Sequence, residues 1–473
     1  MKTLQQLLER IVQRVNINLR EAGYDTAPFV NQLIPAEHWA KFYATYGISS
    51  HHPAHLESSN AGLSGSYILG KCRVKNALIY KSGIRGDELK KKGQRVTFKD
   101  FEIPILEDEA FDIQDSLLIK ALVHNCSNDP ETLENFFITN TIALHYANIH
   151  GSPIDGSFLG PFATVDLTTT SDCIVGPFCY IQAGEIGHRR FEPGTLWIHK
   201  PESFEFSYRY SAERLERYIS FQAGRPPKGI LVEFMEDHQG DFHRFFDTVD
   251  FAPCISVPET ASLDLFAVVK PNTSIAENVL VSEHAYLENC SLGKGANAQE
   301  NCYIINATLA GNNVTAHGAK IIAADLDKNV FVGFNSFLNG RHNARLTIGR
   351  GSVIMPHTII DSPVALTIPP EHLAWGLISD PSDLKTHCMA LQDFAAIKGE
   401  FQTGNLVFKG SGSAFVSAFE HRIHHILEAN GAFFDGNKQH GHAQKNRNMS
   451  FTLIQPYAEG ESAGLCPSLS IRP

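Results

Sequence analysis

Two histidines in the second half of the chain have side chains that could accept a proton near neutral pH. His317 lies in "VTAHGAKI" beside Gly318, where the chain is expected to bend, and His342 lies in "NGRHNARL". A neutral imidazole accepts a proton near pH 7, which is what a general base must do. We therefore take His317 and His342 as the candidate catalytic residues.

Polar side chains near these histidines are candidates for binding a substrate or a cofactor. They are Asn335, Arg341, Asn343 and His357. Asn335 could orient a base or a substrate, whereas Arg341 and Asn343 would be carried with His342 on a loop that leaves the regular part of the chain. For each histidine taken alone, a hydrogen-bonded surface residue is the alternative interpretation.

Two groups of histidines have the density of a metal site: His421, His424 and His425 on one face of an expected helix, and His51, His52 and His55 in an expected loop. The helix carries no H-E-x-x-H pattern, and no fourth ligand is indicated. We therefore predict that no metal is bound. The sequence also lacks the phosphate-binding loop, the dinucleotide-binding glycine pattern and the G-x-S-x-G nucleophile motif.

A repeat of aliphatic residues must position these side chains. "LGPFATV" (159–165) returns sixteen residues later as "VGPFCYI" (175–181). Three columns recur at a spacing of seventeen: Ile275, Leu292, Leu309 and Leu326; Val281, Ala298, Thr315 and Val332; Leu287, Ile304, Ile321 and Leu338. A helix drifts out of phase with such a period, and a simple antiparallel strand alternates every second residue. The spacing therefore predicts coils of three short strands, each with one aliphatic residue pointing inward.

Glycines follow several of the inward positions. They are Gly160, Gly176, Gly293 and Gly349. Because glycine tolerates backbone conformations that other residues avoid, we expect these positions to let the chain bend between strands.

The segment "IGRGSVIMPHTIIDSPVALTIPPEHLAWG" (348–376) resembles the closing coils of the hexapeptide-repeat transferases. The resemblance covers 263–376 well and 157–187 moderately. It implies a mainly β fold, a left-handed parallel β-helix whose hand the spacing itself does not show. It also implies a homotrimer, an acetyl-CoA or other acyl-CoA donor lying in a groove between subunits, and a histidine general base.

The rest of the chain divides around the coils. We expect N-terminal helices in 1–56, irregular β-helix coils with loop insertions in 57–187 and a helical insertion in 188–262, where "SFEFSYRYSAERLERYISFQAG" has helical periodicity. The regular β-helix then occupies 263–376. A C-terminal helical extension follows in 377–473, with "FTLIQPY" as a possible final strand.

The composition limits which classes of partner the protein can bind and which cellular compartment it is expected to occupy. Forty basic and fifty-one acidic side chains give a net charge of −11, which disfavours nucleic acid and anionic membranes. Nine cysteines without a C-x-x-C pair suggest reduced thiols. The first residues are typical of an amphipathic helix and not of a signal peptide, and no apolar run is long enough to span a membrane. We expect a cytoplasmic protein that acts on a small molecule.

Taken together, the resemblance and the histidines favour an acyltransferase that uses acyl-CoA to acetylate a hydroxyl or an amine of a sugar or a similar small polar acceptor. A non-catalytic β-helix binding or scaffold protein is one alternative, because the additional segments suit partner contacts as well. A gamma-class-like zinc carbonic anhydrase is another. It needs three convergent histidines, but His284 and His317 fall at the tenth and ninth places of their coils, and no H-x-x-x-x-H follows His317.

Overall fold

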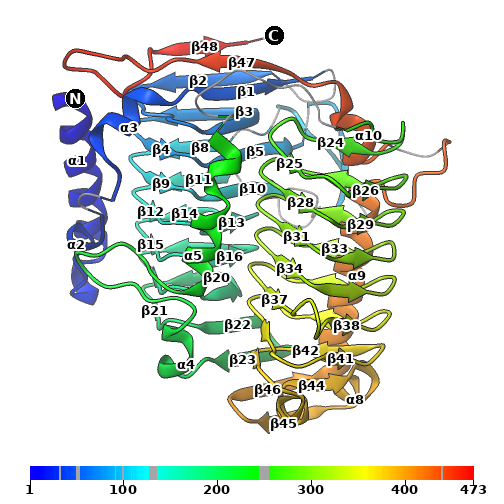
Figure 1. The fold of residues 1–473 in the computed structure, drawn as a ribbon. Helices are drawn as coiled ribbons and strands as arrows, with labels where there is room; N and C mark the ends of the chain where they lie inside the picture. Colours follow the sequence, from blue (N-terminus) through cyan, green and yellow to red (C-terminus); the bar gives the residue numbers. More distant parts are fainter. Residues whose placement is uncertain are drawn as a thin grey trace. The chain divides into compact units, whose positions relative to one another are not determined.

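The structure, a computed structural model, describes the chain except residues 31–32, 50–53, 91, 99–100, 108, 110, 127–135, 244, 246–254, 438–439 and 473. The chain forms two compact units. Unit 1 comprises Met1–Thr195, Ser211–Asp237 and Met449–Pro473, and unit 2 comprises Leu196–Tyr210 and His238–Asn448. Figure 1 shows that short strands stack as successive rungs within each unit.

Unit 2 contains the regular coils. One side of each coil belongs to β24 (Ser262–Leu263), β27 (Leu280–Val281) and β30 (Asn297–Ala298), and then to β33 (Val314–Thr315), β36 (Phe331–Val332), β39 (Val353–Ile354) and β42 (His372–Ala374). The second side is β25 (Val268–Val269), β28 (Tyr286–Glu288), β31 (Tyr303–Ile305), β34 (Lys320–Ile322), β37 (Phe337–Asn339), β40 (Ile359–Asp361) and β43 (Leu377–Ile378). The third is β26 (Ser274–Ile275), β29 (Ser291–Leu292), β32 (Thr308–Leu309), β35 (Ala324–Leu326), β38 (Leu346–Ile348) and β41 (Leu366–Ile368).

The strands of unit 2 pair in the register that the sequence predicts. Ile275 is opposite Leu292, which is opposite Leu309, and the pairing continues to Leu326, all in parallel strands. The column from Leu287 to Leu338 pairs in the same way. These aliphatic side chains lie in one continuous buried core, against which the partly buried Ile275 packs. The prediction of a parallel β-helix is confirmed.

Unit 1 contains a second stack of coils. Its first side is β3 (Tyr67–Lys75), β5 (Gly83–Glu88), β10 (Leu122–Cys126), β13 (Asn148–His150), β16 (Thr164–Asp166) and β19 (Tyr180–Gln182). Its second is β2 (His55–Ser59), the end of β3, β8 (Phe111–Gln114), β11 (Phe136–Thr139), β14 (Ile154–Asp155), β17 (Thr168–Ser171) and β20 (Gly184–Gly187). Its third is β4 (Leu78–Tyr80), β9 (Leu117–Ile119), β12 (Ile142–Ala143), β15 (Phe158–Leu159), β18 (Ile174–Val175) and β21 (Arg190–Phe191).

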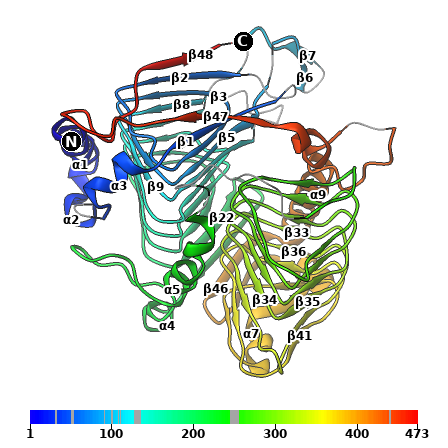
Figure 2. The same cartoon turned by 45° about the horizontal axis from the view of Figure 1, so that its top comes forward.

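Each unit has further elements besides its coils. In unit 1 they are α1 (Lys2–Asn18), α2 (Ala27–Val30), α3 (Ala36–Lys41), α4 (Ala212–Glu216) and α5 (Ile230–Asp237), the hairpin of β6 (Arg95–Phe98) and β7 (Phe101–Pro104), and the strands β1 (Ala44–Ile48), β47 (Ser450–Ile454) and β48 (Leu469–Ile471). In unit 2 they are β23 (Phe204–Arg209), α7 (Leu384–His387), β44 (Cys388–Ala390), α8 (Leu391–Ala395), β45 (Lys398–Thr403), β46 (Leu406–Ser411), α9 (Gly412–Ala429) and α10 (His442–Lys445). The strand β22 (Thr195–Lys200) lies where the chain passes from unit 1 to unit 2. Short 3₁₀ turns lie at Arg20–Ala22, Gln239–Phe242, Pro381–Asp383 and Asn446–Asn448. The long helix α9 runs lengthwise along the coils of unit 2 (Figures 1 and 2).

Corners between strands place one residue each in the left-handed backbone region. At one corner of unit 2 these residues are Asn278, Gly295, Asn312, Asn329, Gly351 and Glu371, with φ between 49° and 71°. Asparagine and glycine recur there because they adopt this conformation at little steric penalty. In the repeated Gly-Pro-Phe motif it is Phe162 (φ 58°) and Phe178 (φ 57°) that take the left-handed conformation.

The glycines that follow the inward positions have a different role from the one expected. Gly160, Gly176, Gly293 and Gly349 do not have positive φ. Instead, a Cβ atom on Gly176 would lie 2.8 Å from the carbonyl oxygen of Phe191, and one on Gly349 would lie 2.4 Å from the nitrogen of Pro370. These glycines are therefore required by the close approach of the next coil and not by the bend.

Three expected segments differ from the structure. The residues 1–56 include strands β1 and the start of β2, and β1 pairs with β3 and with β47. The start of 188–262 is not helical, because β23 alternates buried and partly buried side chains, with Phe204, Phe206 and Tyr208 inside. The period there is two and not 3.6. The residues 377–473 contain the antiparallel hairpin β45–β46 as well as helices, and the expected strand in "FTLIQPY" is β47.

No helix in the part of the chain that the structure describes is long and apolar enough to cross a membrane. The cysteines whose side chains are described are free thiols, and all of them except Cys388 are buried.

We predict that a methyl group on a close-approach glycine of unit 2 destabilises the coils. In Gly333→Ala the new Cβ would lie 2.4 Å from the nitrogen of Pro356. Overpacking of this kind costs about 1–3 kcal/mol. Gly240→Ala is the matched control, because nothing lies within 4 Å of its Cβ position. Urea unfolding monitored by circular dichroism measures both variants, and equal midpoints would refute the close-approach role.

Candidate functional site

Four of the residues singled out from the sequence lie at one corner of the coils in unit 2. This corner joins the side that carries β33 to the side that carries β34. His284, Asn335 and His357 occupy equivalent left-handed positions there, with φ of 56°, 49° and 57°. His317 stands one position before Gly318, which fills the equivalent place in its own coil. The stacking of coils therefore brings His317 and Asn335 onto neighbouring rungs.

His317 is paired with a carboxylate from the preceding coil. Its Nδ1 lies 2.5 Å from Oε2 of Glu300, and both residues are only 2% exposed. The separation of seventeen residues between them is the repeat length, so the glutamate and the histidine occupy the same place in consecutive coils. A carboxylate at Nδ1 favours the tautomer in which Nδ1 carries the proton, and Nε2 is then the nitrogen that can accept one.

The neighbouring backbone and rings hold His317 in place. The backbone N–H of Asn335 donates to the carbonyl oxygen of His317 over 3.0 Å. The ring of Phe334 lies 5.3 Å from the imidazole, and the guanidinium of Arg422 on α9 lies 5.7 Å from the centre of the Phe334 ring. The imidazole is thus held by its contact with the Glu300 carboxylate and by packing, as a general base must be.

A buried lysine lies close to this pair in the chain. Nζ of Lys320 donates to the carbonyl oxygen of Gly318 over 2.6 Å, and the side chain is 1% exposed. Burial lowers the pKa of Lys320 from its ordinary value of 10.5 to about 7, because the charged form loses its hydration. The lysine is therefore partly neutral at pH 7.

This shift predicts a pH dependence of stability. Between about pH 7 and 10.5 the unfolded chain holds a proton on Lys320 that the folded chain has released, so stability rises with pH in this window. Lys320→Met should remove the rise, which is at most about 1.4 kcal/mol per pH unit. Urea unfolding at pH 7.5 and at pH 9.5 compares the variant with Lys328→Met, an exposed control. The same pH dependence in both variants would contradict the shift.

The other predicted catalytic residue lies at a different corner. His342 and Asn343 are exposed on the longer connection between β37 and β38. Arg341 on the same connection contacts β40, because its Nη2 donates to Oδ1 of Asp361 over 2.7 Å. The structure therefore does not place His342, Arg341 or Asn343 beside His317. The role of His342 as a base remains a prediction.

His357 is buried at 0% exposure, and its carbonyl oxygen accepts a hydrogen bond from the hydroxyl of Tyr210 over 2.6 Å.

The histidines that the sequence analysis considered as metal ligands lie elsewhere in the chain. His421, His424 and His425 are on α9, where the His424 ring is 5.3 Å from that of Phe433. His55 lies 3.3 Å from Glu57, and His51 and His52 are outside the described residues.

Unit 1 has a histidine–carboxylate pair that sequence reasoning missed. Nδ1 of His150 lies 2.8 Å from Oδ1 of Asp166, which is 0% exposed, and the hydroxyl of Tyr180 donates to the other oxygen of this aspartate. The ring of His124 meets that of His150 edge to face at 5.2 Å. His124, His150 and Asp166 are aligned by the parallel register of β10, β13 and β16.

A signal for this pair exists in the sequence. Val123, Ile149 and Val165 point inward, and each is followed by one of the three polar residues. The signal was hidden because the first two of these coils are 26 residues apart and the next two are 16 apart. A buried histidine is not by itself a base, since burial, together with nearby Lys120, lowers the pKa of His145 to about 3.

Comparison of the sequence and the structure with known proteins assigns the chain to a family. The sequence profile described as "Hexapeptide repeat including loop" matches residues 101–223. A crystal structure of a proposed acetyltransferase from Desulfovibrio desulfuricans G20 is 48% identical, with 100% of this chain and 99% of that chain covered and a TM-score of 0.93. The chain belongs to the hexapeptide-repeat transferase family. Its fold is accordingly the left-handed parallel β-helix of that family.

Other similarities are weaker. A proposed acetyltransferase from Bacillus cereus is 15% identical over 36% of this chain and 88% of that chain, with a TM-score of 0.18. No curated protein matches the chain.

Proposed function

We propose that this hexapeptide-repeat transferase is an acyl-CoA-dependent acetyltransferase that acts on a hydroxyl or an amine of a sugar or a similar small polar acceptor, with His317 as the general base. The observation that supports His317 most directly is the 2.5 Å contact between its Nδ1 and Glu300 within the coils of unit 2. The Desulfovibrio protein, for which acetyl transfer has been proposed, supports the reaction class.

In the proposed reaction Nε2 of His317 takes the proton of the acceptor as its oxygen or nitrogen attacks the thioester carbonyl. The new ester or amide bond forms as the carbon–sulfur bond of acetyl-CoA breaks, and the imidazolium returns the proton to the leaving thiolate. Glu300 stabilises the imidazolium that forms between the two steps, because an adjacent negative charge favours the protonated ring. Acetyl-CoA and the acceptor are substrates, and no further cofactor takes part.

We propose in addition that the protein is a homotrimer in the cytoplasm. Members of the family assemble along the sides of their β-helices, and the acyl donor lies in the groove between subunits. Asn335 and His357 are proposed to line the substrate side of the His317 corner, since they occupy equivalent positions on the following coils.

Substitution at the pair tests the base. We expect His317→Ala to lower kcat for acetyl transfer about 10²–10⁴-fold, since general-base catalysis contributes that much. Glu300→Gln should lower kcat as well and shift its pH profile, because the neutral amide no longer stabilises the imidazolium. The assay follows radiolabelled acetyl groups from acetyl-CoA onto a panel of amino and hydroxy sugars.

Two further variants make the result decisive. His188→Ala changes an exposed histidine of unit 1 and should leave kcat unaltered. His342→Ala separates the two histidines predicted from the sequence, because a large loss there with none in His317→Ala would move the base to His342. If the wild-type protein transfers no acetyl group and shows no thermal shift with CoA, a binding or scaffold role replaces the proposal.

A second candidate is a zinc-dependent hydration of the carbonic anhydrase type. The observation that favours it is the contact between His124 and His150 in unit 1, with Asp166 at Nδ1 of His150. Histidines that bind metal commonly donate their second ring nitrogen to a carboxylate in this way. When bound, zinc would activate a water molecule. His124 and His150 would supply two of the three protein ligands that catalytic zinc usually has.

Elemental analysis separates the two candidates. The acetyltransferase proposal predicts less than stoichiometric zinc in the purified protein, and equal values in wild type and His150→Ala. A content of about one zinc per chain in the wild type that is lost in His150→Ala and in His124→Ala would favour the carbonic anhydrase type of reaction. Purification without chelators, with zinc in the growth medium, ensures that a low value is meaningful.

A further inference from the structure

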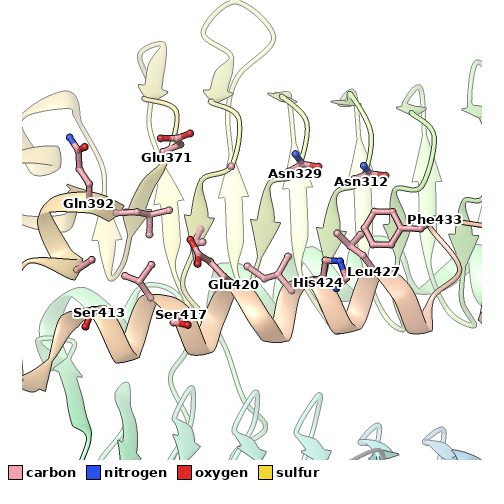
Figure 3. A pocket seen from close by; sticks show the side chains of 16 residues that line it. Asn312, Asn329, Glu371, Gln392, Ser413, Ser417, Glu420, His424, Leu427 and Phe433 are labelled. Carbon is pink, nitrogen blue, oxygen red and sulfur yellow. The ribbon is translucent and has the colours of Figure 1, made fainter.

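A groove of about 920 Å³ runs beside α9 in unit 2. Figure 3 shows its two walls: Asn312, Asn329 and Glu371 project from the coils, and Ser417 and Glu420 project from the helix. The groove is separate from the His317 corner. α9 covers the coil side that carries β33 and β36, where Phe419 contacts Phe331 with ring centres 6.3 Å apart.

The two edges of α9 face different corners. Arg422 approaches the His317 corner, because its guanidinium lies over the ring of Phe334. Asn312 and Asn329 occupy the left-handed positions of the other corner, which joins β32 to β33 and β35 to β36. A molecule in the groove would therefore lie on the opposite side of α9 from His317.

The groove has an apolar floor and polar rims. Val353, Val416 and Leu427 are buried at its base. Asn329, Glu371 and Glu420 are exposed along its edges. Apolar surface flanked by a few polar groups is the usual composition of a site for an organic molecule.

The charge of the groove limits what it can bind. Two glutamates line it, and none of its lining residues is lysine or arginine. Carboxylates and amides accept hydrogen bonds from hydroxyl groups, and the amides can also donate them. A phosphate-bearing molecule such as CoA would meet negative charge without a compensating cation. The lining therefore favours an uncharged molecule rich in hydroxyl groups.

The polar groups repeat along the length of the groove. Asn312, Asn329, Gly351 and Glu371 take the same place in four consecutive coils, and neighbouring coils are separated by about 4.8 Å. At one end the ring of Phe433 is 43% exposed and lies 5.3 Å from the ring of His424. An exposed aromatic face can pack against the C–H face of a sugar ring. A linear chain of sugar units could thus contact equivalent groups at each rung.

We propose that this groove binds an oligosaccharide lengthwise, at a site distinct from the proposed acetyl-transfer centre. The amides of Asn312 and Asn329 and the carboxylates of Glu371 and Glu420 bind its hydroxyl groups, and Phe433 packs against a terminal ring. This site goes beyond the proposed function, because it needs neither His317 nor CoA.

Isothermal titration calorimetry with N-acetylglucosamine hexamer and with maltohexaose tests the site in the full-length protein. We expect saturable binding of at least one of them. Ser417→Trp, which places an indole in the groove from an exposed position, should weaken that binding at least about 10-fold, since even 1.4 kcal/mol has this effect. Asn329→Ala and Glu420→Ala should each weaken it several-fold.

The matched control is His425→Trp, which adds the same indole to an exposed position of α9 that does not line the groove. It should bind the oligosaccharide as the wild type does. Binding of neither oligosaccharide, or equal binding by Ser417→Trp and wild type, would overturn the proposal. Binding of the polycation spermidine without binding of either oligosaccharide would also overturn it, because the glutamates would then attract a cation and not hydroxyl groups. Because the readout is binding and not turnover, a failure of acetyl transfer would leave this result interpretable.

Discussion

The stacking of parallel coils in strict register is the constraint on which the rest of this structure depends. Each coil contributes one aliphatic residue per side to a continuous core, as in the column Ile275, Leu292, Leu309 and Leu326. Burial of each such side chain stabilises the fold by roughly 1.5–3 kcal/mol. The same register brings backbones so close that Gly293, Gly333 and Gly349 cannot carry a side chain without collision.

Register also determines which polar side chains meet. A residue next to an inward position points outward, and its neighbours are the residues at the same place in the coils before and after. Glu300 and His317 meet because they take the same place at a corner of consecutive coils, and His150 and Asp166 in unit 1 meet because they are in register on neighbouring strands. Because a carboxylate one rung away holds the imidazole, a β-helix can orient a base without a dedicated loop. Asn312 and Asn329 are aligned beside α9 by the same rule.

Much of the fold could be predicted because aliphatic residues recur along the sequence with the period of the coils. The seventeen-residue columns of unit 2 specified strands, coils and register, and the structure has them. Prediction failed where burial overrode local pattern. The segment around Phe204 looked helical, but its alternate residues are buried in a sheet with β46. In unit 1 the coils are of unequal length, so the alignment of His124 with His150 could not be read from spacing.

The sequence by itself determined the repeat, the inward columns and the presence of histidines suited to proton transfer, whereas the close approach of the next coil at the glycines came from the structure. Only the tertiary structure decided that His317 faces Glu300 while His342 lies at another corner, and that unit 1 holds His150 against Asp166. The physical reason is that inward positions follow a local period, whereas outward contacts depend on coil length and on what packs over each face. A period can be read along one chain, but a contact between rungs requires all of the connecting residues to be placed.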